Sequence, residues 1–200
     1  FPYPTLFRSR REGMQVHLGG IGKGYAVDET VAWLRRLGVE AALVHGGTST
    51  IYALGAPPGQ DAWEIGLRDP SDPEQRLGVV RLRDQALSTS GDYEQFFEVD
   101  GRRYSHILDP RTGYPAVGMR SATVTAENAT DSDALSTAAF VLGDDAARQL
   151  WDRYSGTGAV LVPVLGRNDS TEIIVRGDVD FTPRGGSPTS RPGSPTRPGR

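Results

Sequence analysis

The sequence predicts an α+β fold, a single domain with a mixed or antiparallel sheet and a few packed helices. Apolar residues recur at helical spacing between Ala26 and Leu37, whereas most other apolar runs are short and end at glycines or prolines, as strands do. Few strands alternate with helices, which argues against a doubly wound parallel sheet. Two hundred residues with a hydrophobic content of 37% can bury a core of ordinary size.

The helices are predicted from residue spacing and from glycines. We expect one helix over residues 23 to 37, with Gly38 as its left-handed C-terminal cap. This helix begins directly after a run of glycines. Two further helices are expected over residues 131 to 142 and 144 to 154, separated by Gly143.

The remaining elements are predicted strands, joined by turns rich in glycine and proline. Asp100-Gly101 between two of them is the signature of a tight β-hairpin. Pro110, directly after Asp109, predicts a β-turn. The predicted strands cover residues 41–45, 49–54, 63–67, 78–83, 94–99 and 102–107, a strand centred on Thr123 and Val124, and residues 159–164 and 172–175.

Both ends of the chain differ in composition from the middle. Residues 1 to 13 are expected to be an artefactual or non-native lead-in, since Phe1 to Ser9 resembles a translated sequencing adapter; a Pro-rich lead-in strand is the alternative. Residues 14 to 176 are expected to form the domain. Residues 177 to 200 are dominated by Pro, Gly, Ser, Thr and Arg, which predicts a disordered tail.

Composition excludes several classes of function. A net charge of -3 and a pI near 5.6 give no basic footprint for nucleic acid. No apolar run approaches the roughly 18 residues of a membrane span. The absence of cysteine excludes disulfides, thiolate metal sites and a cysteine nucleophile, and it leaves the compartment open.

Two glycine-rich turns are candidate binding sites. The first, from Gly19 to Tyr25, opens the first predicted helix, so its backbone N–H groups can receive a phosphate; a structural strand-to-helix turn is the alternative. Lys23 is the only lysine, against twenty-one arginines, which suits a compact ammonium at a phosphate site. The second turn, from His45 to Ser49, can bring backbone close to a flat ligand or can be an ordinary loop.

Polar side chains gather between Thr89 and Pro115. Residues 89 to 94 are expected to form a turn whose hydroxyls and carboxylates hydrogen-bond a polar ligand, or an Asx or Ser/Thr turn without a ligand. His106 ends a predicted strand and can move a proton or donate to a phosphate, although a strand-end histidine is often structural.

An acidic and hydroxyl pair on the second predicted helix is the candidate metal site. Asp133 and Thr137 lie one turn apart on the same helix face, where they can hold a hard cation such as Mg²⁺. Thr130 with Asp133 three residues later also fits a capping box, which would engage both side chains with the backbone instead.

Taken in order, these segments resemble the FAD:protein FMN transferases over about residues 16 to 165. The motifs are Gly19-Gly20-Ile21-Gly22-Lys23-Gly24-Tyr25-Ala26-Val27-Asp28, His45-Gly46-Gly47, Thr89-Ser90-Gly91-Asp92-Tyr93-Glu94, His106-Ile107-Leu108-Asp109-Pro110-Arg111-Thr112-Gly113 and Asp133-Ala134-Leu135-Ser136-Thr137. The resemblance implies a Mg²⁺-dependent enzyme that moves FMN from FAD onto a threonine hydroxyl of an acceptor protein and releases AMP. The alternatives are an FAD pyrophosphatase that gives free FMN and AMP, or a non-catalytic FAD-binding protein.

The resemblance also implies roles for individual residues. His106 is the expected catalytic residue, for proton transfer or phosphate stabilisation, and the acceptor hydroxyl is the nucleophile. Mg²⁺ is expected on the Asp133 and Thr137 side chains and the Gly22 carbonyl, with Thr130 as a further candidate. The residues expected to contact FAD are Gly19, Lys23, Tyr25, Gly46, Gly47, Ser90, Gly91 and Ile107.

Differences from the family pattern concern the cofactor pocket. The chain has His17 where the family usually begins its glycine motif with aspartate, and Val44-His45-Gly46-Gly47-Thr48 where Asn-Ala-Gly-Gly-Asp is frequent. Family members also carry a further N-terminal portion that contributes to the flavin site, and exported members carry a signal or a lipid-attachment cysteine. We therefore expect this chain to fold less well, or to bind FAD more weakly, than its full-length parent.

Overall fold

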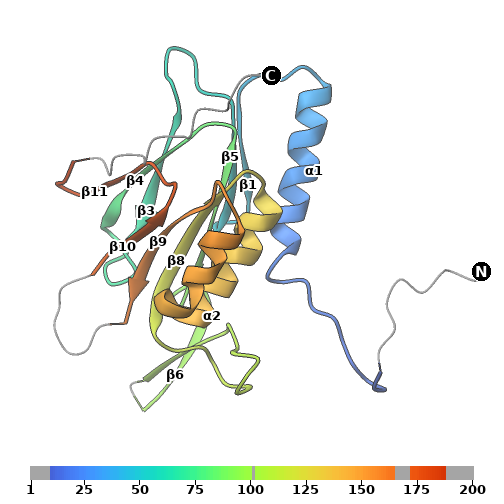
Figure 1. Ribbon diagram of the computed structural model, residues 1–200, viewed down its shortest axis with the longest axis vertical. Coiled ribbons are helices and arrows are strands. Elements are labelled where there is room, and N and C mark those ends of the chain that lie inside the picture. Colours follow the sequence, from blue (N-terminus) through green and yellow to red (C-terminus); the bar gives the residue numbers. More distant parts are fainter. Residues whose placement is uncertain (1–9, 101, 165–171, 188–200) are drawn as a thin grey trace, which may run out of the picture.

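Sheet and helix stack in three layers in the described part of the chain (Figure 1). The computed structural model describes residues 10–100, 102–164 and 172–187. Helices α1, Gly22–Arg36, and α2, Ala129–Arg153, lie on one face of a six-stranded sheet, and a three-stranded sheet covers the other face. This arrangement confirms the predicted α+β class.

The central sheet is antiparallel throughout. In spatial order its strands are β1 (Ala42–Gly46), β2 (Thr50–Leu54), β5 (Gln85–Gly91), β8 (Met119–Ala126), β9 (Gly158–Pro163) and β10 (Ile174–Gly177). Alternate side chains of a strand face opposite layers. On β9, Leu161 packs in one cluster with Phe140 of α2, while Val160 and Val162 pack with Phe181 of the three-stranded sheet.

Two smaller sheets complete the described strands. One contains, in order, β11 (Phe181–Pro183), β4 (Arg76–Leu82) and β3 (Trp63–Arg68). The other is a hairpin of β6 (Phe96–Val99) and β7 (Arg102–Ser105). The hairpin confirms the prediction made at this place, and Asp100 has the positive φ, 51°, that tight hairpin turns favour.

Helix α1 closely matches its prediction from residue spacing. Val27 and Val31, one turn apart, lie on its buried face. Gly38, with a φ of 76°, follows its end, and the Val39 N–H donates to the Leu34 carbonyl. This pattern is a Schellman cap, as the glycine predicts.

Helix α2 is interrupted where the sequence predicts a break, since Gly143 has a φ of 75° and a ψ of 171°. Its N-cap is Asn128, whose side-chain oxygen accepts the Asp131 N–H at 2.7 Å while its amide nitrogen donates to the Asp131 carboxylate. The alternative capping box of Thr130 and Asp133 is therefore wrong, and the Asp133 carboxylate is free for other partners.

The end of β5 differs from its prediction. Thr89 to Gly91 are strand residues, and the turn begins only at Asp92. Small hydroxyl residues and glycine are typical of turns, but here the hydroxyls are paired inside the fold. The Thr89 hydroxyl lies 2.9 Å from that of Thr123 on β8.

Strand β11 also differs, because it falls within the stretch predicted to be disordered. Phe181 is 1% exposed, and the burial of this one large side chain stabilises a strand in an otherwise polar segment. Residues 188–200 of the predicted tail, and residues 1–9 of the predicted lead-in, lie outside the described residues.

Gly24 is the contact point of the two helices. A Cβ added there would lie 2.6 Å from the Ala129 carbonyl carbon and 2.7 Å from the Thr130 Cα. Because backbone atoms of a second helix cannot move aside, we expect Gly24→Ala to lower the free energy of unfolding by about 3 kcal/mol. Denaturant titration measures this against Gly22→Ala, whose added Cβ has its nearest contact at 3.6 Å. Equal stability of the two variants would contradict the close contact.

Candidate functional site

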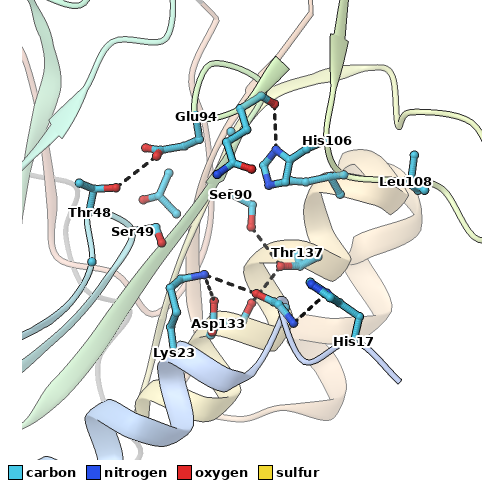
Figure 2. A pocket seen from close by; sticks show the side chains of 17 residues that line it. His17, Lys23, Thr48, Ser49, Ser90, Glu94, His106, Leu108, Asp133 and Thr137 are labelled. Atoms are coloured by element: carbon cyan, nitrogen blue, oxygen red, sulfur yellow. Dashed lines mark hydrogen bonds and ion pairs between the residues drawn. The ribbon is translucent and has the colours of Figure 1, made fainter. Parts of the chain in front are cut away.

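A cavity of about 660 Å³ opens beside the N-terminus of α1, the end of β5 and the first turns of α2 (Figure 2). Its volume lies within the usual range of small-ligand sites. The turn between β1 and β2 and the segment after β7 complete its walls. The lining residues are His17, Gly19, Gly20, Lys23, Gly47, Thr48, Ser49, Thr89, Ser90, Gly91, Glu94, Gln95, His106, Ile107, Leu108, Asp133 and Thr137.

Most of the candidate site residues line this cavity, although they come from five separate segments of the chain. Gly22, Tyr25, Gly46 and the further candidate Thr130 lie outside the lining. The Thr130 hydroxyl donates to the Asp28 carboxylate instead. Tyr25 is 60% exposed on α1, and Gly46 packs against that helix, since an added Cβ would lie 2.8 Å from Val27 Cγ2. The residues in the lining are Gly19, Lys23, Gly47, Ser90, Gly91, His106, Ile107, Asp133 and Thr137.

The cavity is also lined by His17 and by Thr48 and Glu94, which belong to two of the predicted binding turns but had no individual role in the prediction. Thr48 donates to the Glu94 carboxylate at 3.1 Å and so connects positions 46 residues apart, a pairing without any local sequence signal. His17 was recognised only as a difference from the family pattern. Its Nδ1 accepts the Gly19 N–H at 3.2 Å, as an aspartate carboxylate at this position would.

The Asp133 carboxylate is the centre of a polar network at one side of the cavity (Figure 2). Asp133 is 4% exposed, and its Oδ2 accepts the Gly24 N–H at 3.0 Å. Its Oδ1 lies 3.6 Å from Lys23 Nζ, which also donates to the Gly19 carbonyl at 3.4 Å. The close helix contact at Gly24 thus also positions the lysine and the carboxylate.

Hydroxyl groups continue this network toward β5. Thr137 Oγ1 donates to the backbone carbonyl of Asp133 at 3.2 Å and lies 3.2 Å from Ser90 Oγ. Carboxylate and hydroxyl oxygens suit a hard cation such as Mg²⁺, and the Lys23 ammonium already stands as a cation beside Asp133 Oδ1. The donors therefore fit Mg²⁺. The described residues hold no group of three His, Cys, Asp or Glu side chains for a metal, so other oxygens would have to complete the coordination of a Mg²⁺ ion bound here.

His106 lies on the opposite side of the cavity (Figure 2). Its Nδ1 lies 2.9 Å from the Gln95 carbonyl oxygen, which can only accept a hydrogen bond. In the neutral imidazole Nδ1 therefore carries the proton, and Nε2 is left as an acceptor. The Gln95 carbonyl also accepts the His106 backbone N–H at 3.0 Å, so the β6–β7 hairpin fixes the histidine at its base.

Comparison with known proteins identifies the family of this chain. The ApbE family model matches residues 4–161, a range that begins within the predicted lead-in. The chain belongs to the ApbE family. This result confirms the resemblance found from the five sequence motifs.

Curated relatives of this ApbE-family chain include two bacterial FAD:protein FMN transferases. That of Treponema pallidum is 40% identical over 169 residues, which are 80% of this chain and 46% of the relative. That of Klebsiella pneumoniae is 40% identical over 136 residues, 67% of this chain and 41% of the relative. The chain thus spans less than half the length of these two relatives.

Solved ApbE structures share the fold. The ApbE protein of Thermotoga maritima superposes with a TM-score of 0.68 at 37% identity, covering 82% of this chain and 52% of that one. The apo flavinyl transferase ApbE of Pseudomonas stutzeri gives a TM-score of 0.65 at 36% identity, with 81% and 49% covered.

In this ApbE-family chain the segment after His106 is held against α2. The Thr112 N–H donates to the Asp109 carbonyl at 3.2 Å, which confirms the predicted β-turn. Arg111 pairs with the Asp109 carboxylate at 2.7 Å, and these hydrogen bonds lower the pKa of that carboxyl. Arg111 also donates to the Val141 carbonyl at 3.3 Å, which connects the turn to α2, the helix that carries Asp133.

Tyr93 supports the β5 side of the cavity. A Cβ added at Gly91 would lie 2.6 Å from the Tyr93 ring, and the Arg68 guanidinium lies 5.4 Å from the ring centroid. Burial, with the Glu94 charge as a smaller cause, raises the pKa of the Tyr93 phenol to about 12.

The raised pKa of Tyr93 gives a prediction for alkaline solution. The neutral phenol stabilises the fold fully below about pH 10, the ordinary tyrosine pKa, and this contribution is lost as the pH rises through about 12. In an ultraviolet absorbance titration we expect one tyrosine to ionise near pH 12, and Tyr93→Phe to remove that step. Because burial also raises the pKa of Tyr52, the assignment is contradicted if Tyr93→Phe leaves the amplitude of the step near pH 12 unchanged.

Proposed function

We propose that this chain binds FAD in the cavity and, with Mg²⁺, transfers FMN to a threonine hydroxyl of an acceptor protein with release of AMP. The observation that carries the proposal is the convergence of Asp133, Lys23 and His106 on one cavity. The relatives named FAD:protein FMN transferase support the same reaction. In the part of the chain that the structure describes, no helix is long and apolar enough to cross a membrane.

The proposed binding mode follows from the charge and hydrogen-bonding groups of the cavity. In the glycine turn at the start of α1, the N–H groups of Gly19, Ile21, Gly22 and Gly24 already donate within the protein. The Gly20 and Lys23 N–H groups remain for a pyrophosphate, which a helix N-terminus favours. Lys23 lies on the first turn of that helix and adds a positive charge. Asp133 and Thr137 would hold Mg²⁺, which supplies charge neutralisation on the pyrophosphate when bound.

The proposed chemistry is one phosphoryl-type transfer. A bond forms between the acceptor hydroxyl oxygen and the FMN phosphorus, and the bond from that phosphorus to the bridging oxygen breaks, so that AMP leaves. Nε2 of His106, the unprotonated nitrogen of the neutral ring, takes the proton of the attacking hydroxyl. Because the acceptor supplies the nucleophile, the chain needs none.

Product analysis tests the proposal. The chain is incubated with FAD, Mg²⁺ and a threonine-containing acceptor peptide, with the full-length Treponema pallidum relative as a positive control. Transfer predicts AMP and flavinylated peptide in equal amounts. Free FMN with AMP would instead indicate a pyrophosphatase, and bound but intact FAD would indicate a non-catalytic binding protein.

A further inference from the structure

Lys23 lies beside Oδ1 of Asp133, while the Gly24 N–H donates to Oδ2 of the same carboxylate. We propose that the Lys23 ammonium is a placeholder cation, which balances Asp133 in the metal-free site and is released toward the FAD pyrophosphate when a divalent cation binds. The inference rests on the metal site of the proposed function and adds a step to it, an exchange of cations on one carboxylate.

The burial of Asp133 makes a placeholder necessary. A carboxylate that is 4% exposed is costly unless its charge is balanced. The Gly24 N–H occupies Oδ2, and Lys23 is the cation within ion-pair distance of Oδ1 among the described residues. Without either Lys23 or a metal ion, Asp133 would be a buried and unbalanced charge.

The geometry of Lys23 makes the exchange feasible. Its Nζ lies 3.6 Å from Oδ1, too far for a strong hydrogen bond, and its contact with the Gly19 carbonyl is also long, at 3.4 Å. The Lys23 side chain is 42% exposed and lines the cavity, so it can turn away from Asp133 without leaving the site. A divalent cation on Oδ1 repels the ammonium and favours that movement.

The choice of lysine at position 23 is consistent with this exchange. An arginine at this place could form two parallel hydrogen bonds with the carboxylate. The lysine ammonium is a point charge without this bidentate geometry, so it dissociates from the carboxylate more readily. Every other basic side chain apart from the histidines is an arginine. The single lysine is therefore at the position where the proposal requires the cation to leave Asp133. Arginine, lysine and an uncharged side chain at position 23 are therefore expected to give three different metal affinities, lowest with arginine and highest without a charge.

Mn²⁺ binding to the 200-residue chain without FAD tests the series, with free Mn²⁺ followed by electron paramagnetic resonance. We expect Lys23→Met, which removes the competing charge, to bind Mn²⁺ about tenfold more tightly than the wild type. Lys23→Arg should bind several-fold more weakly. Arg36→Met loses the same charge about 20 Å along α1 and should bind as the wild type does. Asp133→Asn should abolish binding in each background.

Two outcomes overturn parts of the argument separately. If the wild type binds Mn²⁺ but Lys23→Met binds with equal or lower affinity, the placeholder role is wrong and the proposed metal site stands. If neither binds Mn²⁺, the proposed metal site itself is wrong, and the exchange with it.

Thermal unfolding gives a second readout that a structural lysine would not produce. In metal-free buffer Lys23→Met leaves Asp133 unbalanced, so its Tm should fall below that of the wild type. Saturating Mn²⁺ should close the gap between the two proteins. A Tm deficit that Mn²⁺ leaves unchanged would show that Lys23 only stabilises the fold.

Discussion

Replacing Asp133 with asparagine is expected to lower AMP release from FAD by about a thousandfold, because charge neutralisation by a bound metal contributes several kcal/mol to such reactions. The asparagine amide oxygen still accepts the Gly24 N–H, so the contact between the two helices is kept. What is lost is the negative charge that would bind Mg²⁺. Chromatographic measurement of AMP at saturating FAD and Mg²⁺ gives the rate directly.

Asp131→Asn is the matched control for Asp133. It removes the same charge two residues earlier, where the Asp131 carboxylate accepts from the Asn128 side chain at the helix N-cap. Because the N-cap bond from the Asp131 N–H remains, we expect a stability loss below about 1 kcal/mol and little change in AMP release. Equal rates for Asp133→Asn and Asp131→Asn would exclude a metal-binding role of Asp133.

Local signals were sufficient for the elements of the fold whose residues interact within a few positions. The helical spacing and Gly38 predicted α1, Gly143 predicted the break in α2, and the hairpin followed from Asp100-Gly101. The placement of Asp133 and Thr137 on one face of α2 also followed from local spacing, because residues four apart lie one turn apart on any helix.

Features decided by distant contacts could not be predicted in this way. The choice of Asn128 over Thr130 as the N-cap depends on Asp28 of α1, whose carboxylate accepts from the Thr130 N–H and hydroxyl 102 positions away. Serine is common in turns, but Ser90 is a strand residue whose hydroxyl lies 3.2 Å from that of Thr137, 47 positions away. In both cases the tertiary partner overrides a local preference.

The candidate site shows the same difference between local signals and distant contacts. The family motifs predicted which residues belong to the site, but not which of their side chains contact one another. The Gly24 N–H and the Asp133 carboxylate are 109 positions apart, and only the close helix contact at Gly24 brings them together. The same contact places Lys23 beside Asp133, a pairing that the sequence does not indicate.

Replacing His106 with alanine is expected to lower kcat by about a thousandfold, within the range for loss of a general base. FAD affinity should change little, since among the described residues the imidazole hydrogen-bonds to the Gln95 carbonyl of the protein. His45→Ala is the matched control, because His45 is an exposed histidine on β1 outside the cavity lining. The rate is measured as AMP release, and FAD affinity as quenching of flavin fluorescence.

Chemical rescue separates proton transfer by His106 from a structural role. Free imidazole should restore part of the rate of His106→Ala, because it can enter the space left by the ring and accept the same proton. It should not restore Asp133→Asn, which lacks a charge instead of a base. A loss of kcat in His106→Ala that imidazole leaves unchanged, with FAD affinity lost in parallel, would mean that the histidine only binds FAD. Rescue of one variant and not the other would divide the reaction into a proton-transfer step at Nε2 and charge neutralisation at Asp133.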